Sequence, residues 1–203
     1  MEKKFVIATG NKGKLKEFKA LLKGYEVISS KEAGFNLDIE ENGKTFRENA
    51  LIKAKTTAIA LNMPAIADDS GICVDALNGE PGIYSARYAG TGVDEDNNNL
   101  LLKNLRGKSN RNARFVCALA CYFPNGKVIY ADGKTEGVIL ESPCGENGFG
   151  YDPIFYSKDL RKSLGVASEE EKNSISHRAR AINALIEKLK KEKLWNIIQA
   201  LTK

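Results

Sequence analysis

The longest apolar run in the chain covers residues 113–123, Ala-Arg-Phe-Val-Cys-Ala-Leu-Ala-Cys-Tyr-Phe. Apolar side chains at successive positions, rather than at alternate ones, are typical of a strand that is buried on both faces. We therefore interpret the run as a central strand. Strand and helix patterns alternate along the rest of the chain, without internal repeats, and this alternation predicts an α/β fold.

The remaining elements are predicted from apolar spacing, capping residues and turn residues. Thr45-Phe-Arg-Glu48 is a capping-box pattern, Asp94 can cap a further helix, and Asn62 and Pro64 are typical of a helix end. The predicted strands cover residues 4–8, 26–29, 64–68, 72–76, 127–131 and 136–140, and the predicted helices cover 12–23, 45–61 and 94–107. Two more helices are predicted to close the chain, the first with an apolar face made of Ala179, Ile182, Leu185, Ile186 and Leu189.

Length and composition set broad limits on the protein. A chain of 203 residues with 42% hydrophobic content fits a single domain, 1–203, made of one body or of two closely packed lobes. No apolar run reaches the roughly 18 residues that a membrane span needs, and the first residues lack a signal-peptide core, so we expect a cytoplasmic protein without a membrane partner. The four cysteines, interpreted as reduced core residues, are Cys73, Cys117, Cys121 and Cys144.

The positive charge is concentrated towards the C-terminus. The net charge is +5, and residues 158–203 hold 11 Lys and Arg against 6 Asp and Glu, while the rest of the chain is balanced. Such a bias can attract polyphosphate or nucleic acid. It is too mild to require nucleic acid, and a solvated helix face explains most of it.

A strand pattern runs into a short polar loop and then into a helix near the N-terminus. The loop is Thr9-Gly10-Asn11-Lys12-Gly13-Lys14. It is not a P-loop, because its glycines stand three apart and Leu15 follows the last lysine. Small residues at a helix N-terminus still allow backbone N–H groups to bind an anion, so the loop predicts a phosphate site. The alternative is an ordinary strand-to-helix turn with surface lysines.

Two adjacent carboxylates, Asp68 and Asp69, follow the apolar strand pattern of residues 64–68, where we expect the strand to end in a turn. Neighbouring carboxylates repel one another unless a cation or hydrogen-bond donors intervene. Oxygen ligands suit a hard ion such as Mg²⁺, and the single histidine makes zinc chemistry improbable. The alternative is a polar turn with an Asp cap. A second acidic loop, Glu40-Glu41-Asn42-Gly43, is a candidate for completing the ion's ligands, although acidic loops are usually only solvated.

A glycine-rich loop contains two aromatic residues. In residues 145–153, Phe149 and Tyr151 stand among glycines, an arrangement that lets a flat base lie against a ring. The alternative is a tight loop with aromatic plugs. Lys172, His177 and Arg178 add positive charge where a helix is expected to begin, which also describes an ordinary surface helix.

Five segments, in order along the chain, resemble the successive signatures of the inosine/xanthosine triphosphate pyrophosphatases. The resemblance extends from Val6 to about Ala184, and its segments are ATGNKGKLKEF, EENGKTFRENALIKA, ADDSGICVDALNGEPGIYSARYAG, FGYDPIF and EEKNSISHR. It implies hydrolysis of ITP, dITP and XTP to the nucleoside monophosphate and pyrophosphate. It also implies an elongated mixed β-sheet flanked by helices, two lobes with the active-site cleft between them, a Mg²⁺ cofactor and a homodimer.

The resemblance also implies roles for individual residues. Asp69 would be the proton acceptor and a metal ligand, with Glu40 as the other ligand, although Glu41 is not excluded. The triphosphate would be held by Thr9, Gly10, Asn11, Lys12, Gly13 and Lys14, assisted by Ser70 and Lys172. The base pocket would be formed by Phe149, Gly150, Tyr151, Asp152, His177 and Arg178. Lys53 joins the substrate-binding candidates, although a solvated helix lysine is its simplest interpretation.

Two rival functions remain open from the sequence. One is a pyrophosphatase of similar fold that prefers modified pyrimidine nucleotides, as in the septum-inhibition relatives. The other is a nucleic-acid-binding module that stacks bases on Phe149 and Tyr151. The acidic pair disfavours the second rival, because Asp68 and Asp69 would repel a phosphate backbone, so we expect no stable nucleic-acid partner.

Overall fold

The computed structural model describes residues 4–36 and 39–191. Within them, seven strands form one sheet in the order β2-β1-β3-β4-β5-β6-β7. The sheet is mixed, because β1 pairs in parallel with β2 and β3, whereas β6 is antiparallel to β5 and β7. The strands are β1 (Lys4–Ile7), β2 (Glu26–Ser29), β3 (Ala65–Val74), β4 (Asn112–Tyr122), β5 (Val128–Ile139), β6 (Phe155–Ser157) and β7 (Lys162–Ser163). The predicted central strand is confirmed, since β4 lies in the middle of the order and is buried throughout residues 117–121.

Helices accompany the sheet, which confirms the α/β class. They are α1 (Lys12–Leu21), α2 (Phe46–Leu61), α3 (Asp94–Asn104), α4 (Glu169–Ile175) and α5 (His177–Lys191), with short 3₁₀ turns at Asp75–Leu77, Gly82–Arg87 and Asp152–Ile154. Helix α4 was not predicted, although Ser168 and Glu171 form a complete capping box at its start. The second of the two helices predicted to close the chain lies outside the described residues.

The chain divides into two compact units. Of the described residues, the first contains 4–36, 39–69, 118–132 and 180–191, and the second contains 70–117 and 133–179. The two lobes and the cleft between them stay a prediction. Every helix in the described parts of the chain is too short or too polar to cross a bilayer.

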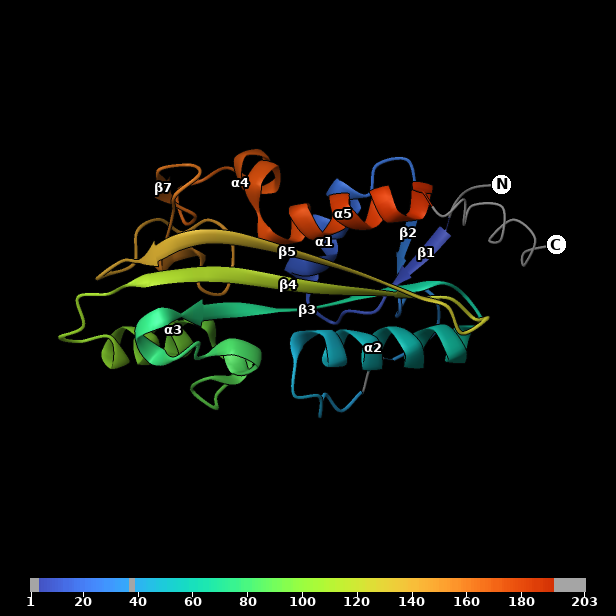
Figure 1. Ribbon diagram of the computed structural model, residues 1–203, viewed down its shortest axis with the longest axis horizontal. Coiled ribbons are helices and arrows are strands. Elements are labelled where there is room, and N and C mark those ends of the chain that lie inside the picture. The colour runs from blue at the N-terminus through green and yellow to red at the C-terminus, as the bar shows by residue number, and fades with distance from the viewer. Residues whose placement is uncertain (1–3, 37–38, 192–203) are drawn as a thin grey trace. The chain divides into compact units, whose positions relative to one another are not determined.

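In the first unit, α2 lies on one side of β3 and α5 on the other (Figure 1). The face of α2 towards the sheet is built from alanines, and Ala50 and Ala54 pack with Ala67 of β3. Small side chains let the helix approach the strand closely. This matters for the site, because Asp69 follows Ala67 at the next position on the same face of the strand.

The second unit has its own apolar core. It is formed by side chains of β3, β4, β5, β6 and α3 together with those of nearby loops, and Phe115 and Phe155 pack with their ring centroids 4.6 Å apart. Its main buried members are Ile72, Val74, Leu101, Leu105, Phe115, Ile139, Tyr151, Ile154 and Phe155.

The predicted break between strands at residues 68–72 is wrong. Strand β3 continues through Asp68, Asp69, Ser70 and Gly71, so the two carboxylates lie in the middle of a strand and not at its end. Gly71 does not mark a turn. A Cβ at that position would lie 2.4 Å from the carbonyl oxygen of Gly82, so the glycine allows the 3₁₀ segment to pack against the strand.

Three further expectations need correction. The strands predicted at 127–131 and 136–140 are one continuous strand, β5. Asp94 is the first residue of α3 rather than its cap, because Val93 occupies the N-cap position. Cys144 is exposed and so is not a core residue, whereas Cys117 and Cys121 are buried, and all four cysteines are free.

Candidate active site

The loop predicted to bind phosphate leads directly into α1. Asn11 is the N-cap residue, and its Oδ1 accepts a hydrogen bond from the Lys14 N–H at 2.9 Å, while Thr9 Oγ1 accepts one from the Asn11 N–H at 3.2 Å. The first-turn N–H groups of Lys12 and Gly13 have no hydrogen-bond acceptor within the described residues. Such groups at a helix N-terminus, with the helix dipole behind them, suit an anion.

Lys14 forms an ion pair with Asp68. Its Nζ lies 3.1 Å from Asp68 Oδ2, and the Asp68 side chain is fully buried. Asp68 therefore directs the ammonium group of Lys14 from the opposite face of β3 to that used by Asp69. The two neighbouring carboxylates avoid mutual repulsion by facing different partners.

Asp69 is held by two side chains of α2. Asn49 Nδ2 donates a hydrogen bond to Asp69 Oδ2 at 3.0 Å, and Lys53 Nζ lies 3.8 Å from Asp69 Oδ1. Lys53 also pairs with Glu41 at 2.7 Å. The predicted solvated lysine is thus a buried one, and it links the acidic loop to Asp69.

The surroundings of Asp69 favour its protonated form. Burial raises the pKa of Asp69 above its ordinary value, and it outweighs the opposing effects of Lys53 and of the hydrogen bond from Asn49. The negative charge of Glu41 raises the pKa further. A buried carboxylate with a raised pKa is a better proton acceptor than an exposed one.

Of the two candidate glutamates, Glu41 has contacts with the rest of this cluster. It is half-buried beside Lys53, whereas Glu40 is exposed. Within residues 4–36 and 39–191, no three carboxylate, thiol or imidazole groups form a preassembled metal site. Two carboxylates suffice for Mg²⁺, which usually keeps several waters and binds substrate phosphates.

In the second unit, Asp152 organises the glycine-rich loop. Its Oδ2 accepts a hydrogen bond from the Phe149 N–H at 2.8 Å and pairs with Lys172 Nζ at 2.6 Å. Lys172 Nζ also lies 4.3 Å from the centroid of the Phe149 ring. Lys172 therefore lies beside the loop predicted to bind the base, and Asp152 holds both the lysine and the loop backbone in place.

Two further predicted residues lie at the start of α5. The Arg178 side chain is buried, and its Nη2 donates a hydrogen bond to Ser70 Oγ at 2.9 Å. His177 is also buried, and its ring stacks on Phe115 with centroids 4.9 Å apart. A guanidinium held inside the protein can donate to a ligand only in a defined direction.

Tyr151 is not a stacking platform. Its ring belongs to the core, its hydroxyl donates to the Ser85 carbonyl at 2.8 Å, and burial raises the pKa of that hydroxyl. Phe149, half-buried beside Lys172, remains as an aromatic surface. Of the two rings that the nucleic-acid interpretation uses, only that of Phe149 is partly exposed.

Two backbone N–H groups of the glycine-rich loop donate to carboxylates of the same unit. The Phe149 N–H is taken by Asp152, and the Gly150 N–H donates to Asp94 Oδ2 at 2.7 Å. Asn98 holds the same glycine from the other side, with Nδ2 3.1 Å from the Gly150 carbonyl oxygen. These contacts of Asp94 and Asn98, and that of Asn49 with Asp69, were not predicted, because each residue is one polar residue among several on a helix.

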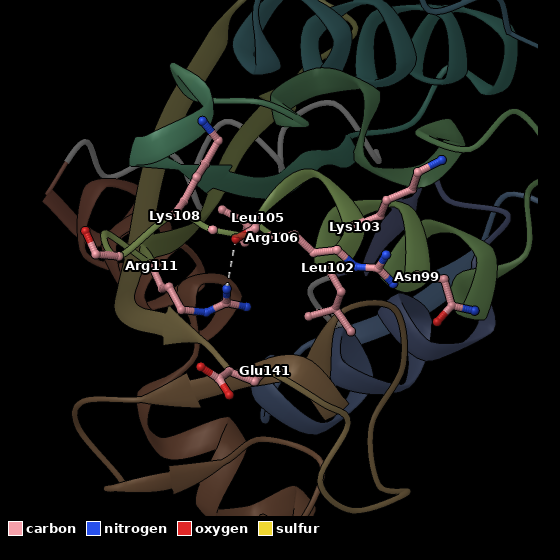
Figure 2. A pocket seen from close by; sticks show the side chains of 10 residues that line it. Asn99, Leu102, Lys103, Leu105, Arg106, Lys108, Arg111 and Glu141 are labelled. Atoms are coloured by element: carbon pink, nitrogen blue, oxygen red, sulfur yellow. Dashed lines mark hydrogen bonds between the residues drawn. The ribbon is translucent and has the colours of Figure 1, made fainter.

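A separate cavity of about 790 Å³ lies beside α3 in the second unit (Figure 2). Its lining includes Lys103, Arg106, Lys108 and Arg111 with one acid, Glu141, and none of the predicted site residues. Arg111 is committed to structure, because Nη2 donates to the Leu140 carbonyl at 2.6 Å and Nε to that of Ile139 at 2.7 Å. The other three basic residues are exposed, and so is Glu141, so this cavity has no buried carboxylate of the kind found in the Asp69 cluster.

Comparison with known proteins decides the family. The family model described as the Ham1 family matches residues 5–188. The chain belongs to the Ham1 family. A Staphylococcus epidermidis protein named dITP/XTP pyrophosphatase is 50% identical over 188 residues, which cover 92% of this chain and 96% of that protein. A Bacillus subtilis protein of the same name is also 50% identical, covering 90% and 95% of the two chains.

A solved structure supports the same assignment at the level of the fold. The Ham1 protein of Staphylococcus aureus matches with a TM-score of 0.85 and 48% identity, covering 94% of this chain and all of that one. This Ham1 chain therefore shares the fold and nearly the full length of its relatives. The motifs that suggested the family all fall inside the matched region.

Proposed function

We propose that this protein hydrolyses dITP, ITP and XTP to the nucleoside monophosphate and pyrophosphate, and so removes deaminated purines from the nucleotide pool. The proposal rests on Ham1 family membership and on relatives named dITP/XTP pyrophosphatases. The single structural observation that supports it best is Asp69, a buried carboxylate held between Asn49 and Lys53. A cytoplasmic homodimer with Mg²⁺ as its cofactor is part of the proposal.

Asp69 acts as the general base in this mechanism. Water attacks the α-phosphorus, Asp69 takes the proton of that water, and the bond to the bridging oxygen of the leaving pyrophosphate breaks. The raised pKa of Asp69 suits the role. Lys53 and Asn49 fix the direction of the carboxylate, so that one oxygen is oriented by hydrogen bonding.

The donor set fits Mg²⁺. Asp69 and a glutamate of the acidic loop, Glu40 or Glu41, are hard oxygen ligands, and the effect of Glu41 on the pKa of Asp69 indicates that these charges interact. When bound, Mg²⁺ neutralises phosphate oxygens and lowers the pKa of a coordinated water. Lys53 keeps the two carboxylates from repelling one another through its contact with each.

Positively charged groups bind the triphosphate and offset charge on the leaving group. The N-terminus of α1, with Lys12 and Lys14, binds the phosphates, and Lys14 and Lys172 stabilise the departing pyrophosphate. Each of these two lysines contacts a buried aspartate, Asp68 or Asp152, which holds the ammonium group in one place. Such preorganisation lowers the cost of ordering a flexible side chain on binding.

Selection among purines depends on the six position, which carries a carbonyl in inosine and xanthosine and an amine in adenosine. Arg178 is our candidate donor to this carbonyl, because its guanidinium is buried and oriented by Ser70. An adenine amine would leave such a donor unpaired, and a mismatch of this kind discriminates by a factor of about 10⁴. Phe149 provides the ring against which the base lies.

Replacing Asp69 by Asn tests the mechanism. The amide keeps the size of the side chain and an acceptor for Asn49, but it cannot take a proton from water. We expect the kcat of pyrophosphate release from dITP to fall by at least about 10²-fold. Asp75→Asn, which alters an exposed aspartate paired with Arg114, is the control and should keep near wild-type turnover. Retention of turnover within a few-fold by Asp69→Asn would show that Asp69 is not the base.

A further inference from the structure

Asn49 connects the two acidic parts of the site. Its side chain is buried, with 1% of the residue exposed. Its Nδ2 donates to Asp69 Oδ2 at 3.0 Å, and its Oδ1 accepts from the Gly43 N–H at 2.8 Å. One amide group therefore joins β3, which carries Asp69, to the loop that carries Glu40 and Glu41.

The orientation of this amide follows from its partners. A backbone N–H can only donate, so the Gly43 N–H must face the amide oxygen of Asn49. The amide nitrogen then faces Asp69, where an ionised carboxylate can only accept. Aspartate at position 49 could accept from the Gly43 N–H but could not donate to Asp69, and leucine could do neither. Asp69 is buried, and a buried group that loses its hydrogen-bond partner is costly.

The contact with Asn49 also requires glycine at position 43. A Cβ at position 43 would lie 2.6 Å from Asn49 Oδ1 and 2.7 Å from Glu48 Cβ. The loop can approach the amide this closely only because the residue lacks a side chain. The acidic loop is also fixed next to the helix start, where Glu48 Oε2 accepts from the Lys44 N–H at 2.6 Å.

We infer that Asn49 is a positioning residue that sets the carboxylate of Asp69 and the acidic loop at a fixed mutual distance, so that both can serve one metal ion. The inference rests on the proposed function for the role of Asp69. In this role Asn49 acts through Asp69 and the loop and needs no contact of its own with substrate or metal. Its effect is exerted through the direction of Asp69 and the place of the loop backbone.

The matched control is Asn97. It is equally buried, with 1% exposed, and its amide also bridges two backbone segments, accepting from the Ala89 N–H at 2.7 Å and donating to the Ala86 carbonyl at 3.4 Å. Both hydrogen bonds of its amide go to residues 86–89, and none recorded in the described parts of the chain leads to Asp69 or to the acidic loop. Asn97→Ala therefore removes a buried amide that both donates and accepts a hydrogen bond, and it leaves the link between Asp69 and the acidic loop unchanged.

The experiment compares Asn49→Ala, Gly43→Ala, their double variant and Asn97→Ala. Pyrophosphate release from dITP gives kcat and KM, and Mn²⁺ binding to the free protein is followed by electron paramagnetic resonance. Asn49→Ala and Gly43→Ala should each lower kcat by about 10-fold to 10²-fold and weaken Mn²⁺ binding by about 10-fold, because misplaced groups act poorly and outer-shell partners tune metal affinity. KM should change much less than kcat. Asn97→Ala should lower the denaturation midpoint and leave kcat and Mn²⁺ affinity within about threefold of wild type.

The double variant separates the inference from a general loss of packing. If both residues act through one link, the kcat of the double variant should lie within about threefold of the lower kcat of the two single variants. Losses that multiply, or an Asn49→Ala variant as active as Asn97→Ala, would overturn the inference. If Asn49→Ala does not fold, Gly43→Ala still tests the inference, because its added Cβ displaces the loop from Asn49 while the buried amide is kept. Failure of the proposed function would appear differently, as wild-type protein that releases no pyrophosphate from dITP.

Discussion

At the scale of single residues, Asp69 carries an electrostatic cost that its neighbours reduce without removing. Burial is the largest effect on its pKa and acts against the charged form, while Lys53 and Asn49 act in the opposite direction. The balance is a raised pKa. Keeping this carboxylate charged therefore lowers the stability of the folded protein, as expected for a group placed for chemistry rather than for stability.

Asp69→Asn should consequently stabilise the protein near neutral pH in the absence of divalent metal. A folded-state pKa above the unfolded value means that the contribution of wild-type Asp69 is favourable below the unfolded pKa and is lost as pH rises through the folded pKa. The variant lacks this loss. Its Tm should exceed that of wild type at about pH 7, and the difference should shrink towards about pH 4. A variant with a lower Tm at both pH values would contradict the direction assigned to the pKa.

Lys53 should set the pH range over which Asp69 works. Its positive charge lowers the pKa of Asp69, so Lys53→Gln should raise that pKa and move the acidic limb of the kcat/KM profile to higher pH. Lys55→Gln on the same helix is the control, because Lys55 is exposed. An acidic limb at the same pH in both variants would show that Lys53 does not govern Asp69.

The residue chemistry could be predicted from the sequence only in part. Paired aspartates after an apolar strand indicate an acidic site, and a Gly-Asn-Lys-Gly-Lys loop before a helix indicates a phosphate site. The partners of these residues could not be predicted, because Asn49 and Lys53 meet Asp69 across a helix–sheet contact. No local pattern specifies which helical polar residue faces which strand.

At the scale of elements, the prediction of two strands around Asp69 failed because glycine occurs both in turns and in strands that another backbone segment approaches closely. Ser70-Gly71 is typical of a turn, yet Gly71 here provides room for the carbonyl of Gly82 and the Ser85 hydroxyl against a straight strand. The hydroxyl of Ser85 accepts from the Ile72 N–H at 2.9 Å and so ties the segment to β3. Close approach of two backbone segments depends on tertiary structure and leaves no signal in a sequence window.

The glycine-rich loop from Gly148 to Asp152 depends on one buried carboxylate. Asp152→Ala removes the acceptor of the Phe149 N–H and the carboxylate that pairs with buried Lys172. Removing one partner of a buried ion pair costs about 3–5 kcal/mol, so the free energy of unfolding should fall by roughly 3 kcal/mol or more. Glu170→Ala on α4, an exposed position, should change it by less than about 0.5 kcal/mol. Urea unfolding measures both, and equal stabilities would show that the pair contributes little.

At the scale of the whole molecule, the class of fold followed from alternating strand and helix patterns and from one strand buried on both faces. The strand order did not follow. The antiparallel pairing at one edge adds β6 and β7 to β5, and these two strands of 3 and 2 residues carry too little periodicity to be recognised. Helix α4, which Ser168 caps, was missed although its capping box is local, because the helix has only seven residues.

The central claim is that the whole chain cleaves a nucleoside triphosphate between the α and β phosphates and selects a purine with a six-position carbonyl. Product analysis on dITP, XTP, dATP and a modified pyrimidine triphosphate, with and without Mg²⁺, tests it most directly. We expect magnesium-dependent release of pyrophosphate and the nucleoside monophosphate from dITP and XTP, with dATP slower by about 10⁴-fold. Orthophosphate with a nucleoside diphosphate, or a rate on dATP or the pyrimidine equal to that on dITP, would contradict it.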